Sequence, residues 1–383
     1  MKIAVLKEMR TDERRVALVP ESCKKLIQCG YVVSVEKDAG QAAFYPDDAY
    51  REVGCTIESD PKAMVVSADL VVKVNPPKIT ADRNEVEWMR PETVLLTSLM
   101  PLRYLDVVSE LARRKICAFS TDAIPRSTRA QSMDTLSSMA NIVGYKGALI
   151  AATELSKYFP MFMTAAGTVF PAKVFVIGAA VAGLQAIATA RRLGAHVTAT
   201  DVRPEVKEQI ESLGAKYVGI ELKESASSTG GYAKELSQED KNRQRELLVQ
   251  QCAAVDVVIT TALIGGVFAP KLITEDMVRH MRPGSIIVDL AGDGGGNCEL
   301  SRPGETVLIH GIKIICPLNL PSTMPTHASL LFSRNLTAFV QAFTKDKIFH
   351  LDLSDDIQKN SIITHRGEVI HVPTKKALEK GEK

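Results

Sequence analysis

The sequence predicts an α/β protein that contains two doubly wound parallel sheets joined by long crossing helices. Its 383 residues are enough for two domains of roughly 150 residues each. Short apolar runs alternate with helical segments in both halves, and strands separated by helices favour parallel sheets. We expect residues 1–135 and 330–383 to form the first α/β domain, and residues 136–329 to form the second.

Composition and charge are those of an ordinary globular protein. Charged residues make up 24% of the chain and the formal net charge is +2, with both signs mixed throughout, so no nucleic-acid partner is indicated. The seven cysteines form no C-x-x-C pair, and the seven histidines lack the spacing of metal ligands, so we expect neither a disulfide framework nor a metal site. The first residues lack the long apolar region of a signal peptide, which favours a cytoplasmic setting.

The first half of the chain is expected to consist of strands separated by helices. A helix should open at Pro20 and close at Gly30, because glycine readily adopts the left-handed conformation that ends helices. Apolar runs predict strands over residues 3–6, 31–35, 69–74, 94–99 and 116–120.

A long helix should then join the two halves. Ser127 or Thr128 can cap it, and no proline interrupts the chain before about residue 158. In the second half a helix over 326–343 should cross back to the first domain, and 362–372 resembles a hairpin that turns at Arg366 and Gly367. The charged tail 375–383 is expected to fray. Further strands are predicted over 215–218, 255–260, 285–290 and 312–315.

Residues 173–201 predict a strand, a glycine turn, a helix, a second strand and then an acid. Gly178 follows the apolar run 174–177, Gly183 comes five residues later, and Asp201 ends the second strand. This is the layout of a dinucleotide-binding βαβ unit, so we expect the domains to be Rossmann-like. Backbone N–H groups at the helix start can hold a pyrophosphate. A carboxylate at Asp201 can accept both ribose hydroxyls and would repel a 2′-phosphate, which favours NAD over NADP.

The same segment leaves alternatives open. Ala180 stands where the motif has its middle glycine, which places a methyl group in the path of the diphosphate, and Arg203 could contact a 2′-phosphate. An ordinary βαβ unit without a ligand would have the same outline. Residues 174–190 carry no charge, but these 17 residues fall short of the ~20 apolar residues of a membrane span, which we therefore reject.

Three loops in the second half are candidates for ligand contact. Residues 221–235 are polar and glycine-rich with one aromatic, Tyr232, and form either a lid or a solvated surface loop. Residues 291–298 are also glycine-rich, and their backbone either approaches the nicotinamide half of a cofactor or forms a tight turn. Residues 260–266 follow a predicted strand, where open α/β sheets bind ligands.

Three stretches carry a resemblance to a known family. Residues 126–138 (RSTRAQSMDTLSS), 163–168 (MTAAGT) and 183–189 (GLQAIAT) closely resemble the NAD(H)-binding component, within the α subunit, of proton-translocating NAD(P) transhydrogenases. The resemblance spans nearly the whole chain, from Lys2 through residues 14–20 to residues 333–336. It extends more distantly to alanine dehydrogenase, which shares the two-domain fold.

The resemblance implies that hydride passes between NAD(H) on this chain and NADP(H) held by a partner domain. This transfer would be coupled to proton movement through a membrane component. It also implies a homodimer. Because this chain carries no membrane helix of its own, we expect a separate subunit, cytoplasmic and peripheral on the inner face of the cell membrane through its membrane-embedded partner subunits.

The family motif R-x-x-R-A-Q-S-M-D-x-L-S-S on the nicotinamide side is present in full, and it carries over to Arg126, Gln131, Asp134 and Ser137. Its amide, carboxylate and hydroxyl would recur every three residues on a helix, where they can hold a carboxamide and a ribose. Arg126 would orient Asp134 or contact the cofactor. The same residues could instead be ordinary polar surface at a first helical turn. The positions that match the family's turn and cofactor contacts are Gly178, Ala180, Val181, Gly183, Asp201, Val202, Arg203, Gly231, Tyr232, Gln244, Ala262 and Leu263.

Chemistry separates the candidate reactions. Direct hydride transfer between two nicotinamide rings needs juxtaposition, orientation and exclusion of water, whereas oxidation of an amino acid also needs a proton acceptor. Lys73 and Arg15 match the substrate-binding lysine and arginine of alanine dehydrogenase, but Met100 stands at the position of its catalytic histidine. A thioether exchanges no proton at neutral pH, so we favour transhydrogenation. An alanine-type amino-acid dehydrogenase and a non-catalytic NAD-binding module are the alternatives.

Overall fold

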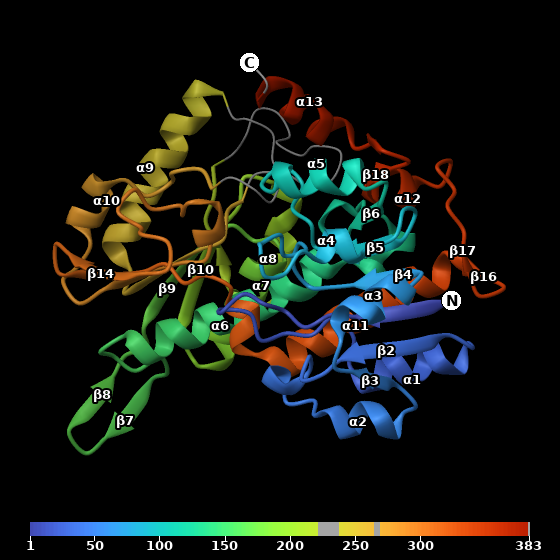
Figure 1. Ribbon diagram of the computed structural model, residues 1–383. Coiled ribbons are helices and arrows are strands. Elements are labelled where there is room, and N and C mark those ends of the chain that lie inside the picture. Colours follow the sequence, from blue (N-terminus) through green and yellow to red (C-terminus); the bar gives the residue numbers. More distant parts are fainter. Residues whose placement is uncertain (221–236, 264–268, 382–383) are drawn as a thin grey trace. The chain divides into compact units, whose positions relative to one another are not determined.

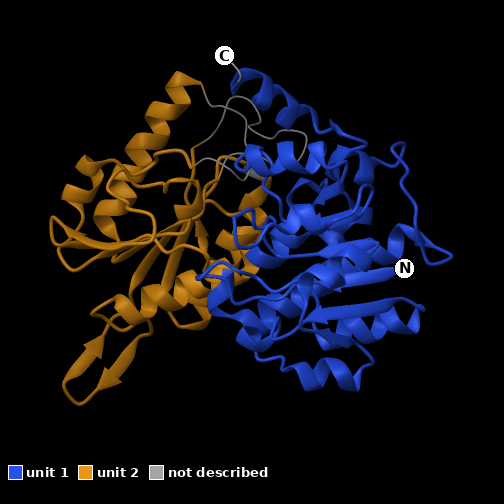
Figure 2. Ribbon diagram, in the orientation of Figure 1, with its two compact units in different colours: residues 1–139, 321–383 blue, residues 140–320 orange. Residues whose placement is uncertain are grey.

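The computed structural model describes residues 1–220, 237–263 and 269–381, and the chain divides into two compact units. Unit 1 contains residues 1–139 and 321–383, and unit 2 contains residues 140–320 (Figure 2). The chain thus passes between units after residues 139 and 320, whereas the sequence placed the domain boundaries after 135 and 329. The candidate lid 221–235, with Gly231 and Tyr232, lies outside the described residues.

The described residues of unit 1 form an eight-stranded sheet in the order β19-β18-β6-β5-β4-β1-β2-β3 (Figure 1). The strands β1 to β6 pair in parallel, and the hairpin β18–β19 extends the sheet antiparallel to β6. The predicted strands and the C-terminal hairpin are therefore confirmed. Their bounds are β1 Lys2–Val5, β2 Val32–Glu36, β3 Thr56–Glu58, β4 Leu70–Val72, β5 Val94–Thr97, β6 Cys117–Ser120, β18 Ile362–His365 and β19 Glu368–Val369.

The helices of unit 1 include one where the sequence predicted a frayed tail. Residues of the tail form α13, and Thr374 within it is fully buried and lies 2.7 Å from His371 Nδ1. Helix α1 begins at Pro20 as predicted, with the proline in its first turn. The bounds are α1 Pro20–Gln28, α2 Asp47–Glu52, α3 Pro61–Ser67, α4 Glu85–Trp88, α5 Leu105–Arg113, α11 Pro325–Ala342, α12 Asp356–Ser361 and α13 Val372–Gly381, with a small hairpin of β16 Thr344–Lys345 and β17 Ile348–Phe349.

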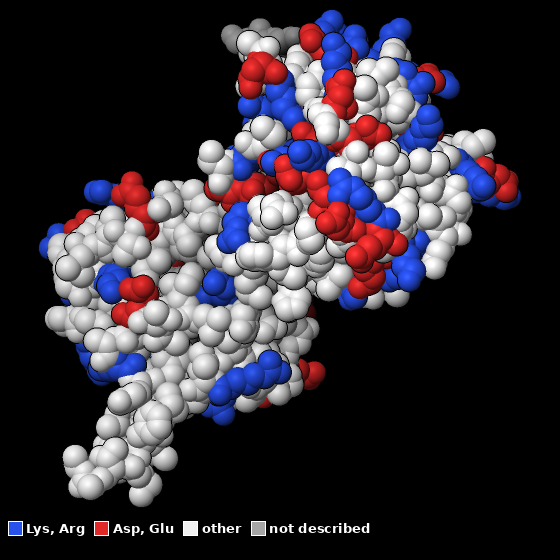
Figure 3. Space-filling view, turned by 60° about the horizontal axis from the view of Figure 1, so that its bottom comes forward, with Lys and Arg blue, Asp and Glu red and all other residues white. Residues whose placement is uncertain are grey.

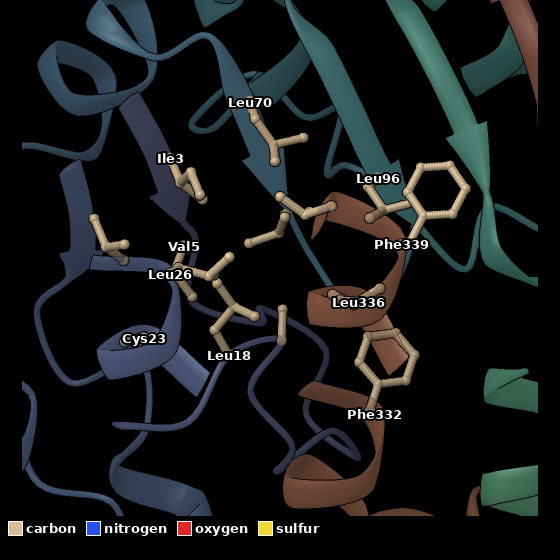
Figure 4. Close-up of a cluster of buried hydrophobic side chains, with 14 of the residues drawn as sticks. Ile3, Val5, Leu18, Cys23, Leu26, Leu70, Leu96, Phe332, Leu336 and Phe339 are labelled. Atoms are coloured by element: carbon tan, nitrogen blue, oxygen red, sulfur yellow. The ribbon is translucent and has the colours of Figure 1, made fainter. Parts of the chain in front are cut away.

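Helix α11 supplies much of the core beneath the unit 1 sheet. Phe332, Leu336 and Phe339 recur at helical spacing, are fully buried, and face the strand residues drawn in Figure 4. Each such side chain contributes roughly 1.5–3 kcal/mol when it leaves water. The serines on the same helix, Ser329 and Ser333, accept backbone N–H groups from the segment before α1. The C-terminal part of the chain thus completes the N-terminal core.

The described residues of unit 2 form a seven-stranded sheet in the order β11-β10-β9-β12-β13-β15-β14. All pairs are parallel except β14 with β15, so the predicted doubly wound sheet is confirmed. The order reverses at β9, which places β10 on one side of it and β12 on the other. The bounds are β9 Lys173–Ile177, β10 His196–Thr200, β11 Lys216–Tyr217, β12 Val257–Thr260, β13 Ile286–Asp289, β14 Thr306–Ile309 and β15 Ile312–Ile315.

Glycines let the helices of unit 2 approach one another closely. A Cβ on Gly144 of α6 would lie 2.0 Å from the carbonyl oxygen of Ala182 on α7, and one on Gly147 would lie 2.5 Å from Leu290. The two glycines that weaken α6 as an isolated helix therefore permit its packing against α7. The bounds are α6 Thr135–Glu154, α7 Val181–Arg192, α8 Lys207–Ser212, α9 Gln238–Ala254 and α10 Glu275–His280.

Two further observations concern unit 2 and the helices. Residues 161–171, to which the sequence assigned no element, contain a hairpin of β7 Phe162–Thr164 and β8 Gly167–Val169. Across the described ranges, no helix combines the length and the apolar composition needed to cross a membrane.

Candidate dinucleotide-binding site

The glycine turn of unit 2 lies between β9 and α7, and its geometry demands glycine at two positions. Gly178 has a φ of +92°, and a Cβ there would lie 2.8 Å from Thr261 Oγ1. Gly183 packs onto the same turn from α7, where a Cβ would lie 1.8 Å from the carbonyl oxygen of Gly178. The helix start is therefore held directly against the strand end, as a dinucleotide-binding turn requires.

Ala180, the departure from the glycine motif, is the N-cap residue of α7. Its φ of −76° and ψ of −168° are open to any L-residue, so the alanine brings no backbone strain. Its side chain is exposed and accepts no hydrogen bond from the helix. Because no side chain caps α7, the first backbone N–H groups of the helix are suited to an anion such as a diphosphate.

Asp201 stands directly after β10, and its carboxylate is fully engaged. It accepts hydrogen bonds from the N–H of Ala179 (2.8 Å) and the N–H of Arg203 (2.9 Å), and from Nε and Nη2 of the Arg203 guanidinium (3.0 Å each). This hydrogen bonding raises the pKa of Arg203. A carboxylate has about four acceptor positions, so a ribose hydroxyl would have to displace one of these donors. Arg203 thus pairs with Asp201 itself, the carboxylate that would exclude a 2′-phosphate.

The third strand end belongs to β12, where the chain continues through Thr261, Ala262 and Leu263. Thr261 donates its N–H to the carbonyl of Ile177 (2.9 Å) and its hydroxyl to the carbonyl of Gly178 (3.0 Å). The sequence analysis singled out this segment but not Thr261. Its only signal was a polar residue directly after a buried strand that precedes the expected cofactor contacts.

The structure brings most of the predicted cofactor residues to these three neighbouring strand ends. Gly178 follows β9, Asp201 and Val202 follow β10, and Ala262 and Leu263 follow β12. Gln244 is different, because it lies in the middle of α9 and is half-buried there. Within the described ranges, no hydrogen bond joins Gln244 to the glycine turn or to Asp201, so its role stays a prediction. The strand ends together fit a dinucleotide laid across β10, β9 and β12.

The predicted nicotinamide-side motif of unit 1 forms two short elements instead of one helix. A 3₁₀ turn covers Thr128–Met133, and α6 begins at Thr135. Asp134 separates them, because its carboxylate accepts the N–H (2.8 Å) and the hydroxyl (2.6 Å) of Ser137 in the first turn of α6. The expectation of a continuous helix from Ser127 or Thr128 was therefore wrong.

The motif side chains are consequently not repeated along one helical face. Gln131 lies exposed on the 3₁₀ turn, Asp134 caps the helix, and Ser137 is paired with Asp134. Arg126 is exposed before the turn. The buried side chains of Ala130 and Met133 belong to the unit 1 core, which anchors the turn that carries Gln131.

Two cations near the carboxyl ends of the unit 1 strands are held by internal carboxylates. Lys73 is fully buried, with its Nζ 3.2 Å from Glu85 and 3.6 Å from Glu8. Burial opposes its charge, but the two carboxylates outweigh burial and raise the pKa of Lys73. The guanidinium of Arg15 lies on Glu13 at 2.8 and 2.7 Å. The residues that match the substrate-binding pair of alanine dehydrogenase are thus occupied by the chain itself.

Met100, at the matching position of a catalytic histidine, is on a tight turn after β5. Its φ is +45°, its N–H donates to Asp122 (3.1 Å), and its side chain is 40% exposed. An exposed thioether at this point offers no proton acceptor.

The buried pair of Glu13 and Arg15 predicts an acid-dependent stability. Burial raises the pKa of Glu13, but hydrogen bonds from Arg15 and Asn75 outweigh burial and lower it to about 2, against an ordinary value of 4.5. The ionised carboxylate therefore stabilises the fold above pH 4.5, and this contribution disappears as the pH falls toward 2. It is worth at most about 3 kcal/mol.

Chemical denaturation of the wild type and of Glu13→Gln between pH 3.5 and 7 measures this contribution. The stability advantage of the wild type should be constant near neutral pH and should shrink as the pH falls below 4.5. Glu52→Gln, an exposed carboxyl on α2, is the control and should show no such difference. An advantage that is independent of pH would contradict the assignment.

Comparison with known proteins places the whole chain in one family. The family model described as "Alanine dehydrogenase/PNT, N-terminal domain" matches residues 4–143, and the model described as "Alanine dehydrogenase/PNT, C-terminal domain" matches residues 147–372. An NAD(P) transhydrogenase subunit alpha of Rhodospirillum rubrum, the first of the parts into which that subunit is divided by name, is 47% identical over 377 residues, which cover 97% of this chain and 98% of the relative.

A solved structure and a more distant relative agree with that placement. The crystal structure of transhydrogenase from Sinorhizobium meliloti matches with a TM-score of 0.87 at 40% identity, covering 96% of this chain and 100% of that one. Alanine dehydrogenase 2 of Staphylococcus aureus is 28% identical over 387 residues, covering 99% of this chain and 97% of the relative. The family binds NAD(H), in agreement with the cofactor predicted from the sequence. The chain belongs to the alanine dehydrogenase/PNT family, and within it is more similar to the Rhodospirillum rubrum transhydrogenase subunit than to the Staphylococcus aureus alanine dehydrogenase.

Proposed function

We propose that this chain is the NAD(H)-binding subunit of a proton-translocating NAD(P) transhydrogenase. In this role it presents its cofactor for direct hydride exchange with NADP(H) held on a partner domain. The observation that carries the proposal is the near full-length similarity to a relative named as an NAD(P) transhydrogenase subunit alpha. The three strand ends of unit 2 and the complete motif of unit 1 support it.

The residues of the chain have limited tasks in such a reaction, because NADH when bound supplies the hydride itself. The glycine turn and α7 hold the diphosphate through backbone N–H groups, and Asp201 holds the adenosine ribose. Gln131, Asp134 and Ser137 orient the nicotinamide. The hydrogen bond between Asp134 and Ser137 already exists without cofactor, so less conformational entropy is lost when they act. Arg126 supports this group.

The internal ion pairs of unit 1 favour this function over amino-acid oxidation. A carboxylate substrate would have to displace Glu13 from Arg15, and Lys73 has no path to a substrate while it is buried between Glu8 and Glu85. Met100 provides no general base. None of these groups is needed to pass a hydride between two nicotinamides.

The partners follow from the function. A hydride donor subunit needs an NADP(H)-binding domain, and coupling to protons needs membrane-embedded subunits, so this chain would sit peripherally on the inner, cytoplasmic face of the cell membrane.

An exposed apolar hairpin supports a homodimer. The stretch from Tyr158 to Ala172 contains no charged residue, and Figure 3 shows the β7–β8 hairpin at the lower left as a projection free of Lys, Arg, Asp and Glu. Met163 is 80% exposed and Phe170 is 79% exposed. Apolar surface of this kind is typical of a contact with another protein. A second copy of this chain is the partner that we propose.

The central experiment mixes the purified chain with an NADP-binding partner domain, NADH and a nicotinamide-analogue acceptor. Gln131→Asn and Asp134→Asn should each lower hydride transfer by about tenfold or more, since small misplacement of reacting groups has large effects on rate. Affinity for NADH, measured by its fluorescence, should change by less than about threefold, because the diphosphate and the ribose are held elsewhere. Gln250→Asn, on the exposed side of α9, is the matched control.

Two outcomes would contradict this reading. If the variants abolish NADH binding while transfer per bound cofactor is unchanged, the orienting role is wrong. If the chain alone oxidises L-alanine with NAD, it is an amino-acid dehydrogenase; if no hydride moves even with the partner, the binding-module alternative gains support.

Asp201→Ala tests the cofactor preference. The variant should bind NADH about tenfold more weakly, because two ribose hydroxyls lose a charged acceptor. It should also bind NADPH better relative to NADH, because Arg203 is released from its carboxylate partner and can pair with a 2′-phosphate. Asp276→Ala on α10 is the exposed control. An unchanged ratio of the two affinities would rule out the ribose assignment.

Sedimentation velocity tests the homodimer. The wild type should sediment as a dimer at micromolar concentrations, and Phe170→Asp or Met163→Asp should shift it toward monomer, because a buried unpaired carboxylate opposes association. Leu308→Asp changes an equally exposed apolar residue on β14 and should leave the dimer intact. A monomeric wild type, or dimers in all variants, would exclude this contact.

A further inference from the structure

Asn297, in the glycine-rich loop after β13, makes an unusual set of contacts with the chain after β12. It is fully buried, its Oδ1 accepts the N–H of Ala262 (3.0 Å), and its Nδ2 donates to the carbonyl of Ala262 (2.8 Å). Nδ2 also donates to the carbonyl of Pro270 (2.9 Å). The amide therefore pairs with both backbone groups of Ala262, as a neighbouring strand would. Only a side chain with a donor and an acceptor side by side can do this.

The loop that carries Asn297 is itself fixed by Asp289 at the end of β13. This fully buried carboxylate accepts the N–H of Cys298 (3.0 Å), the hydroxyl of Ser301 (2.6 Å) and the hydroxyl of Thr260 (3.0 Å). Gly296 has a φ of +81°, and a Cβ there would lie 2.7 Å from Asp289 Oδ2, so a larger residue would disturb the loop.

Lys271 closes the loop from its other side. Its Nζ donates to the carbonyls of Gly295 (2.7 Å), Gly296 (2.8 Å) and Cys298 (3.2 Å). The polar groups of the glycine-rich loop are thus largely directed to the protein. The loop behaves as a scaffold for Asn297 and answers the choice left open by the sequence in favour of a tight turn.

Ala262 is also fixed from the opposite direction, through Thr261. The hydroxyl of Thr261 donates to the carbonyl of Gly178 in the glycine turn, and its N–H donates to the carbonyl of Ile177. Segment 261–262 is therefore held between the glycine turn and the loop after β13. The two contacts join three neighbouring parallel strands, β9, β12 and β13, at their carboxyl ends.

The strand order shows which half of a bound dinucleotide this segment would meet. Strand β12 lies beside β9 on the side opposite β10. A cofactor with its adenosine ribose at Asp201 and its diphosphate at the glycine turn must continue over the end of β12. Segment 261–262 therefore faces the nicotinamide half, and the adenosine half lies away from it.

We propose that Asn297 and Thr261 are positioning residues for the nicotinamide half of the cofactor, acting by fixing the backbone of Ala262. The inference rests on the proposed binding of NAD(H) across unit 2. It distinguishes two halves of one ligand: changes at Asn297 and Thr261 should affect contacts beyond the diphosphate and leave those of the adenosine half in place.

The test measures two ligands on the full-length chain, NADH by its fluorescence and AMP by calorimetry. Asn297→Asp keeps the shape but turns two donated hydrogen bonds into contacts between oxygens, and should weaken NADH by about tenfold or more. Affinity for AMP should change by less than about twofold, since its contacts lie at β10 and the glycine turn.

A matched pair at Thr261 separates the hydroxyl from general packing. Thr261→Val removes the donor to Gly178 at nearly constant volume and should weaken NADH about fivefold or more, whereas Thr261→Ser retains the hydroxyl and should bind like the wild type. Rescue by serine is the result that a purely structural role of side-chain volume would not produce.

Several results would overturn the inference. If Asn297→Asp weakens NADH and AMP equally, the network supports the whole domain and does not position one half. If Thr261→Val and Asn297→Asp bind NADH like the wild type, the backbone of Ala262 needs no such support. A wild type that binds neither ligand would instead overturn the proposed function, and the two failures are therefore distinguishable.

Discussion

The contact between Gly183 and the carbonyl of Gly178 is the constraint on which unit 2 depends. With a Cβ at Gly183 only 1.8 Å from that oxygen, no other residue lets α7 meet the end of β9 so closely. This approach places the first N–H groups of α7 at the edge where β10, β9 and β12 end. It also leaves room for the Thr261 hydroxyl, which lies where a Cβ of Gly178 would be. Helix α6 follows the same rule, since Gly144 allows it to lie against α7.

Charges in both units are satisfied within the chain. In unit 1, Lys73 and Arg15 are neutralised by glutamates, so cations that match a substrate site in a relative stabilise the fold here. In unit 2, Asp201 and Arg203 neutralise each other where a ribose would bind. The same family fold can therefore support different reactions through the partners of a few buried charges, while the strands that carry them stay in place.

The sequence predicts most of the sheets because buried parallel strands are short apolar runs, and it predicts the glycine turn because sterics there allow only one residue type. It does not predict the break at Asp134, where a local hydrogen bond to Ser137 overrides good helix formers. Helix α13 was missed because its charged composition resembles a frayed end, although Thr374 is buried. The roles of Thr261 and Asn297 depend on backbone groups distant in sequence, to which periodicity and motif spacing are blind.

The central claim is that the strand ends of unit 2 hold NAD(H) by backbone groups at a glycine turn and select it through Asp201. Isothermal titration calorimetry of the unmodified chain with NADH, and then with NADPH, tests this claim most directly. The account predicts saturable heat from NADH with a single class of sites and much weaker binding of NADPH. Absence of heat with NADH, or equal binding of the two cofactors, would contradict it.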